Sequence, residues 1–142
     1  MIAGVRKDDG TLADARRLLL ESLSGLPSGS ESETSCPLLG ANTTIGVVVV
    51  NAPLSKVQAG KVAEMAHDGL ARTIYPVHTP ADGDILLALS TGEGPEARVG
   101  RVGALAAEVV ARAVLDAVRA AESLPGLPAV RDLPAPPITL ER

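Results

Sequence analysis

Two short runs of apolar residues most strongly limit the folds available to this chain of 142 residues. The first, Val47–Val50, is four consecutive valines, and the second, Ile85–Leu89, holds only Ile, Leu and Ala. β-Branched residues favour strands, and a strand that is apolar at every position is typical of one buried on both faces. We therefore expect central strands at residues 44–51 and 84–90. A two-stranded sheet is marginal by itself, so we expect the neighbouring strands to come from elsewhere in the protein or from another chain.

Three further segments have the spacing of helices, with apolar residues repeating every three or four positions. Thr11 is the expected N-cap of the first helix, with Asp14 three positions later, and Ser55 is the expected N-cap of the second. The order of helices and strands predicts an α/β fold. The expected helices are residues 11–23, 54–74 and 102–123.

Polar segments connect these elements. Residues 25–40 are rich in Ser, Gly and Pro, which predicts a flexible surface loop. Residues 77–83 predict a turn, and the Pro-rich tail from Ala129 is expected to be extended or frayed.

The composition excludes several classes of protein. Tyr75 is the one aromatic residue, so the core must consist of Val, Leu, Ile and Ala, and its elements must approach closely. The net charge is −4 without a basic stripe, which gives no support to nucleic-acid binding. No apolar run reaches about 18 residues, so no membrane span is expected. The single cysteine, Cys36, cannot form an internal disulfide, which is typical of a reducing cytoplasm.

Thr43 is the first candidate for chemistry, because it follows Asn42 directly before the first apolar strand. A threonine at the start of a strand is usually structural. If the bond between Asn42 and Thr43 is cut, however, the freed α-amine can act as the base for the Thr43 hydroxyl. The residues alone leave both interpretations open.

Two carboxylates, Asp82 and Asp84, precede the second strand. Side chains two residues apart point to the same side of an extended chain, so this pair can hold an amine or a cation. An ordinary Asp-Gly turn is the alternative. His67 is expected to be a structural residue of the second helix, and His78 lies nearer the candidate centre. No third ligand at a suitable spacing predicts a zinc site, and no motif predicts a cofactor.

Six segments taken together resemble the P1 family of peptidases, the L-aminopeptidase/D-esterase and β-aminopeptidase group. The resemblance covers residues 40–92, and the helix at 102–123 also suits the family. The matching segments are Asn42–Val48, Lys56–Ala59, Met65–Arg72, Pro76–Thr79, Asp82–Asp84 and Leu89–Gly92.

This resemblance implies an αββα sandwich, of which the chain holds two central strands, and a precursor that cuts itself once. On this sequence the cut falls between Asn42 and Thr43, so residues 1–42 precede a nucleophile-bearing segment, 43–142. Thr43 is then the nucleophile toward a small peptide, amide or ester with a free amine. Asp82 and Asp84 then hold the amine. From its place near this centre, we expect His78 to contact the substrate.

The family's chain extends far upstream of Met1, and that part supplies strands and the oxyanion hole. We therefore expect a single, partial domain that acts as a homo-oligomer or pairs with a missing upstream segment. The resemblance leaves three functions open: a self-processing aminopeptidase, an acyltransferase with the same sandwich, and an inactive remnant or subunit that needs a partner.

Overall fold

A computed structural model describes residues 5–6, 12–14, 16–18, 20, 43–80 and 82–133 of the chain. The chain divides into two compact units, which are described separately below. The first unit comprises Met1–Glu31 and Asp116–Arg142, and the second comprises Ser32–Leu115. The expected loop at residues 25–40 lies outside the described residues.

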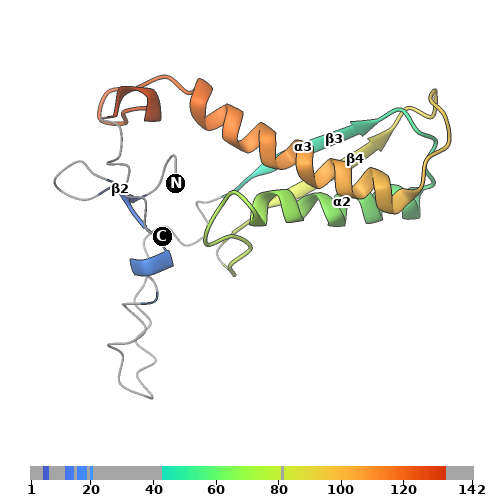
Figure 1. Cartoon of the computed structure of the whole chain (residues 1–142), viewed down its shortest axis with the longest axis horizontal. Helices are drawn as coiled ribbons and strands as arrows, with labels where there is room; N and C mark the ends of the chain where they lie inside the picture. Colours follow the sequence, from blue (N-terminus) through green and yellow to red (C-terminus); the bar gives the residue numbers. More distant parts are fainter. Residues whose placement is uncertain are drawn as a thin grey trace, which may run out of the picture. The chain divides into compact units, whose positions relative to one another are not determined.

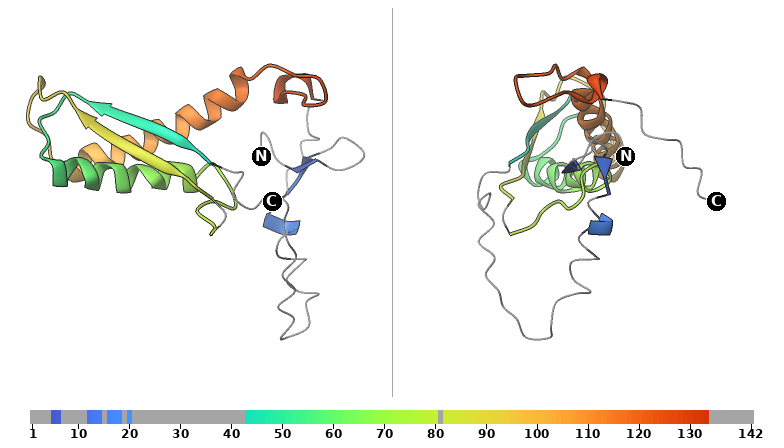
Figure 2. Two further views of the ribbon diagram at one scale, coloured as in Figure 1. Left: turned by 180° about the vertical axis from the view of Figure 1, so that it is seen from behind. Right: turned by 90° about the vertical axis from the view of Figure 1, so that its left-hand side faces the viewer.

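The second unit is a strand–helix–strand–helix arrangement of β3 (Ile45–Val50), α2 (Lys56–Ala71), β4 (Ile85–Ser90) and the start of α3 (Val99–Ala120). The two strands are parallel, with Ile45 paired to Ile85 and Val50 paired to Ser90 (Figures 1 and 2). Parallel strands require a crossover, and α2 provides it. The α/β class and both expected strands are confirmed, and among the described strands no third one joins this sheet.

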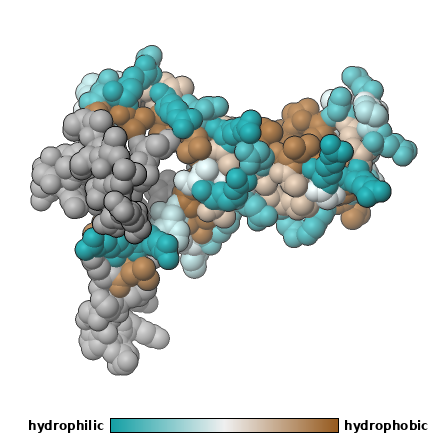
Figure 3. Space-filling view, viewed as in Figure 1, coloured by the Kyte–Doolittle hydropathy of each residue, from teal (hydrophilic) through white to brown (hydrophobic). Residues whose placement is uncertain are grey.

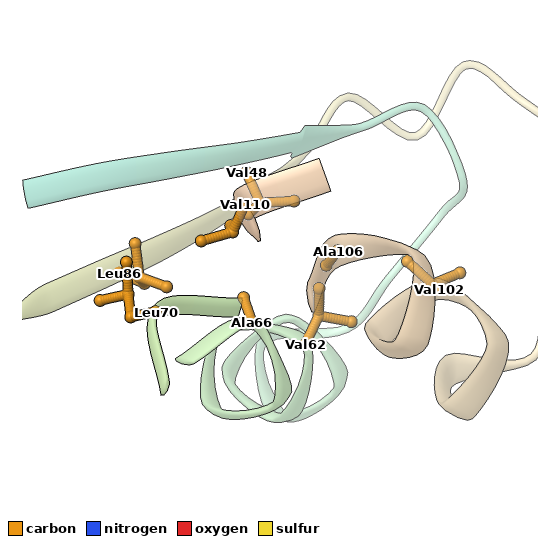
Figure 4. Packing of buried hydrophobic residues seen from close by; sticks show 8 residues of the cluster. All are labelled: Val48, Val62, Ala66, Leu70, Leu86, Val102, Ala106 and Val110. Atoms are coloured by element: carbon orange, nitrogen blue, oxygen red, sulfur yellow. The ribbon is translucent and has the colours of Figure 1, made fainter. Parts of the chain in front are cut away.

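The core lies on one face of the sheet, between the two strands and the two helices. Val48 and Leu86 point from the sheet toward side chains of α2 and α3 (Figure 4). All of these side chains are aliphatic, as the composition predicted. The cluster consists of Val48, Val62, Ala66, Leu70, Leu86, Val102, Ala106 and Val110.

The other face of the sheet is exposed in the described part of the chain. It carries three side chains from each strand, all of them apolar. The expectation that both faces are buried is therefore wrong for the described residues, because no described element covers this face. The exposed fractions are Ile45 72%, Val47 55%, Val49 64%, Ile85 45%, Leu87 50% and Leu89 56%. We call these six residues the open sheet face; apolar surface is also visible where β3 and α3 lie in Figure 3.

The bounds of the long helices differ slightly from those expected. Helix α2 begins at Lys56, and Ser55 is its N-cap in a full capping box with Gln58. Helix α3 begins three residues earlier than expected and ends at Ala120. The carbonyl groups of Ala120 and of Ala121, the residue after the helix, accept hydrogen bonds from the Arg131 side chain, which satisfies acceptors at the helix end.

The first expected helix, at residues 11–23, is wrong at its N-terminal end. Leu12–Ala13 form strand β2, which pairs antiparallel with β1 (Val5–Arg6). Helical residues begin after Asp14, whose carboxylate accepts hydrogen bonds from the backbone of Arg16 and Arg17. Asp14 therefore acts as the cap that was assigned to Thr11, because Asp is itself a preferred N-cap.

The tail is also more ordered than expected near Ala129, which is buried. Val130–Asp132 form a short 3-10 helix, η1. The Ser123 hydroxyl joins this segment, since it accepts a hydrogen bond from the Ala129 backbone at 2.7 Å and bonds to Asp132. The expectation of an extended tail is therefore wrong for residues 129–132.

Candidate functional site

The two parallel strands start side by side, and this brings together the residues that precede them. Thr43 and Thr44 lead into β3, and Gly83 and Asp84 lead into β4. The Ile85 backbone N–H donates to the Thr44 carbonyl at 2.8 Å, so the pairing continues one residue beyond β3. The sheet register therefore fixes Thr43 and Asp84 at the same edge.

The side chain of Asp84 is nearly enclosed at this edge, with 7% of it exposed. Its Oδ1 accepts a hydrogen bond from the Thr44 backbone N–H at 2.9 Å. Its Oδ2 lies 3.2 Å from His78 Nδ1. Both carboxylate oxygens thus have a partner, and one of these partners is the peptide group that joins Thr43 to Thr44.

Thr43 is exposed, and its hydroxyl lies against Gly83. A Cβ atom at position 83 would stand 2.8 Å from Thr43 Oγ1, which is closer than real Cβ contacts. The glycine is therefore required for the present position of the hydroxyl. Asn42 lies outside the described residues, so the structure does not describe the expected cleavage bond.

The two histidines lie next to each other, although they are 11 positions apart in the sequence. His67 Nδ1 is 3.3 Å from His78 Nε2, and the two rings meet edge to face with centroids 4.8 Å apart. His78 has a φ of 56°, in the left-handed region that non-glycine residues rarely occupy. Both ring nitrogens of His78 have neighbours, and its role in substrate binding stays a prediction.

Asp82 does not share the position of Asp84. Its Oδ2 accepts a hydrogen bond from the Thr79 backbone at 2.7 Å, and its own N–H donates to the Thr79 carbonyl at 3.0 Å. The side chain therefore closes the turn before β4. This contact matches the turn interpretation of Asp82, and its role in holding an amine stays a prediction.

The His67–His78–Asp84 contacts were not predicted from the sequence. The strand periodicity located Asp84, but the approach of His67 depends on the turn that folds the chain back after α2. The left-handed backbone at His78 is part of that turn, and no residue type in this segment signals it.

The described residues contain no group of three metal-binding side chains that could hold an ion. No helix among them is long and apolar enough to cross a membrane.

Comparison with known proteins decides the family. The model of Peptidase family S58 matches residues 10–130 of the chain. The chain belongs to peptidase family S58. The S58 match includes Thr43, Asp84 and both histidines.

Curated relatives agree with the S58 assignment. An uncharacterized aminopeptidase of Mycobacterium tuberculosis is 46% identical over 106 residues, covering 65% of this chain and 31% of the relative. An uncharacterized aminopeptidase of Mycobacterium leprae is 46% identical over 111 residues, covering 68% of this chain and 31% of the relative. A 6-aminohexanoate-oligomer endohydrolase of Kocuria is 38% identical over 90 residues, covering 55% of this chain and 25% of the relative.

The matched segment spans less than a third of the length of these S58 relatives. The expected peptidase family is confirmed at this level, and the narrower L-aminopeptidase/D-esterase subgroup stays a prediction.

Proposed function

We propose that this S58 chain carries the nucleophile of a self-processing hydrolase that cleaves amides or esters of substrates with a free amine. Thr43 is the proposed nucleophile, and the bond between Asn42 and Thr43 is the proposed cleavage site. The observation that supports this most is the position of Asp84, which is nearly enclosed and holds the Thr44 backbone N–H at 2.9 Å.

The processing step that we propose begins at the Thr43 hydroxyl. Thr43 Oγ attacks the carbonyl carbon of Asn42, and the peptide C–N bond breaks as the Thr43 nitrogen takes up a proton. The product is an ester between Asn42 and Thr43. Water then attacks this ester, which releases the Asn42 carboxylate and restores the Thr43 hydroxyl. Because Asp84 holds the Thr44 N–H, Thr43 stays at the same edge of the sheet after the cut.

The freed α-amine supplies the base for the second reaction. An α-amino group has an ordinary pKa of about 8, so a useful fraction is neutral near physiological pH and can accept the Oγ proton. Thr43 Oγ then attacks a substrate carbonyl and forms an acyl-enzyme, the amine or alcohol of the substrate leaves, and water releases the acid. A negative side chain such as Asp84 or Asp82 near this centre favours substrates that carry an ammonium group.

The substrate class rests on the relatives. Four of them are aminopeptidases by name, and three are 6-aminohexanoate-oligomer endohydrolases. Both kinds of substrate contain an amide bond and a free amine. We therefore propose chromogenic aminoacyl anilides and 6-aminohexanoate oligomers as the first two substrates to test.

The assay compares wild type with two variants of Thr43. Thr43→Ala should abolish release of the aniline, whereas Thr43→Ser should retain part of it, since the hydroxyl remains. Thr91→Ala is the matched control, because Thr91 lies beyond the other end of β4 and is exposed. Equal turnover by wild type and Thr43→Ala would refute the proposal. An added amine acceptor in the same assay distinguishes acyl transfer from hydrolysis.

A second candidate is a chain that is inactive until another segment covers the open sheet face. The six exposed apolar side chains of β3 and β4 favour it, because a water-exposed apolar patch of this kind marks an interaction surface. The test is to repeat the assay with the remainder of an S58 relative supplied as a separate chain. Turnover that appears only in the mixture supports this candidate.

A further inference from the structure

Three side chains form a continuous line of contacts from helix α2 to the peptide group after Thr43. His67 Nδ1 lies 3.3 Å from His78 Nε2, His78 Nδ1 lies 3.2 Å from Asp84 Oδ2, and Asp84 Oδ1 accepts the Thr44 N–H at 2.9 Å. The three residues come from a helix, a turn and the start of a strand. All of them belong to the same compact unit.

The available protons restrict how these groups bond. An ionised Asp84 can only accept hydrogen bonds, so His78 must carry its proton on Nδ1 to bond with it. When both histidines are neutral, the Nδ1–H of His67 donates to Nε2 of His78. When His78 is charged, its Nε2–H donates to Nδ1 of His67. His67 can therefore serve as donor or acceptor, and the bond between His78 and Asp84 is kept in both states.

The backbone supports the same arrangement. His78 occupies the left-handed region with a φ of 56°. Such conformations persist where the surroundings hold them, and they concentrate at functional sites. Here the conformation accompanies a ring that is bonded on both sides.

We propose that His67 and His78 are positioning residues for the reaction at Thr43, which act through Asp84. His78 orients the Asp84 carboxylate, and His67 fixes the tautomer in which His78 can do so. The carboxylate in turn holds the Thr43–Thr44 peptide at the sheet edge. This inference rests on the function proposed above.

The first test detects the contacts by NMR and does not depend on enzymatic activity. The chain contains two histidines, so a ¹⁵N-labelled sample gives two sets of imidazole signals that single substitutions assign. Long-range ¹H–¹⁵N spectra should show His78 protonated at Nδ1. Asp84→Ala should change the signals of both histidines. His67→Ala should shift the Thr44 amide signal, because the contacts through His78 and Asp84 connect His67 to that amide.

The second test measures the rate of self-cleavage between Asn42 and Thr43. His67→Ala should slow self-cleavage by about tenfold or more, because even a small misplacement of a reacting group is costly. His67→Gln should recover most of the rate, because its amide can donate or accept toward His78. His78→Asn should recover part of it, since Asn tolerates the left-handed backbone and offers a donor near the Nδ1 position. Glu64→Ala is the control on the same helix, where an exposed pair with Lys61 is lost.

The two tests separate the two proposals. If wild type does not cleave, either alone or with the remainder of an S58 relative, while Asp84→Ala and His67→Ala change the spectra as expected, the proposed function fails and the contacts stand. If Thr43-dependent cleavage occurs but His67→Ala changes neither the Thr44 signal nor the rate, the positioning role is overturned. A His78 ring protonated only at Nε2 would overturn it as well. His67→Gln keeps the test decisive if the alanine variant is unfolded.

Discussion

Gly83 leaves the space in which the Thr43 hydroxyl lies. Its backbone approaches Thr43 so closely that a methyl group would stand 2.8 Å from Oγ1. The atom that must yield is the end of a small side chain, which can rotate. The glycine therefore matters more for the orientation of the hydroxyl than for the stability of the fold.

We predict that Gly83→Ala slows Thr43-dependent cleavage by about 100-fold, because a small displacement of a reacting atom has effects of this size. The melting temperature should change little. Gly100→Ala is the control, since a Cβ atom there meets nothing within 4 Å. Rates come from the mass of the products over time. Cleavage by Gly83→Ala at the wild-type rate would show that the hydroxyl position is not restricted.

At the level of single residues, the sequence located Asp84 better than Asp82. The alternation of side chains in a strand applies from residue 84 onward, where the chain becomes extended. Asp82 still lies in the turn and bonds to Thr79, so the same periodicity does not extend to it. The contact between His67 and His78 depends on how the chain folds back after α2, which the spacing of residues does not predict.

Helices α2 and α3 approach closely where each has a glycine. A Cβ atom at Gly69 would stand 2.5 Å from the Ala107 carbonyl oxygen, and one at Gly103 would overlap the Met65 side chain. A chain without Phe or Trp has few large side chains to fill a core. Small residues at the helix contact compensate, because they let aliphatic side chains pack at high density.

We predict that Gly69→Ala lowers the free energy of unfolding by about 1–3 kcal/mol, the usual effect of overpacking. The helix backbone of α3 would have to move, since the contact is with a carbonyl group. Gly60→Ala on the same helix should raise the free energy of unfolding by about 0.5–1 kcal/mol. A Cβ atom there has no neighbour within 4 Å, and Ala is the better helix former. Urea denaturation of both variants measures this. A Gly69→Ala variant at least as stable as wild type would contradict the close packing at Gly69.

The same two helices carry an exposed ion-pair group. Arg72, at the end of α2, bonds to Glu108 of α3 at 3.0 Å, and Arg112 bonds to the same carboxylate at 3.1 Å. The hydrogen bond from Arg72, followed by that from Arg112, holds the pKa of Glu108 below its ordinary value of 4.5. A carboxylate with a lowered pKa in the folded state stabilises the fold above its unfolded pKa. This contribution disappears as the pH falls through the lowered value.

We predict that Arg72→Met lowers stability slightly at neutral pH and that its difference from wild type shrinks as Glu108 becomes protonated. The difference should also shrink in high salt, because all three side chains are exposed. Denaturation of both proteins across the acidic range measures it, and Glu108→Gln removes the pH-dependent part. A difference that grows as the pH falls would exclude this pair as its source.

Elements with a strong apolar pattern or a clear cap were predicted best. The valine run gave β3, the aliphatic run gave β4, and Ser55 gave the start of α2 to within two residues. The segment at 11–23 failed because two acceptable caps, Thr11 and Asp14, compete there. Its first residues pair with Val5–Arg6, a contact that the helical spacing does not reveal.

For the molecule as a whole, the open sheet face is the main departure from a closed core. Apolar runs predicted two covered faces, and the described residues cover one. The sequence correctly predicted that both faces of the sheet are apolar, but it does not indicate which element covers the second face. The S58 relatives are more than three times as long as the segment they share with this chain.

We predict that the isolated chain self-associates and binds apolar dyes through this face. Replacing Val47 and Leu87 together by Thr should reduce both properties, since Thr keeps the strand propensity while adding a hydroxyl. Val57→Thr is the matched control: this valine is 83% exposed but lies on α2, away from the sheet. Sedimentation measures self-association, and dye fluorescence measures dye binding. An equal effect of the control would show that the association is unrelated to the sheet.

The most direct test of the central claim, that Thr43 becomes a new N-terminus, is the mass of the purified chain after incubation. We predict two products, residues 1–42 and 43–142, from wild type and one intact mass from Thr43→Ala. The experiment is run on the chain alone and with the remainder of an S58 relative present to cover the open sheet face. A single intact wild-type mass in both samples would contradict the account.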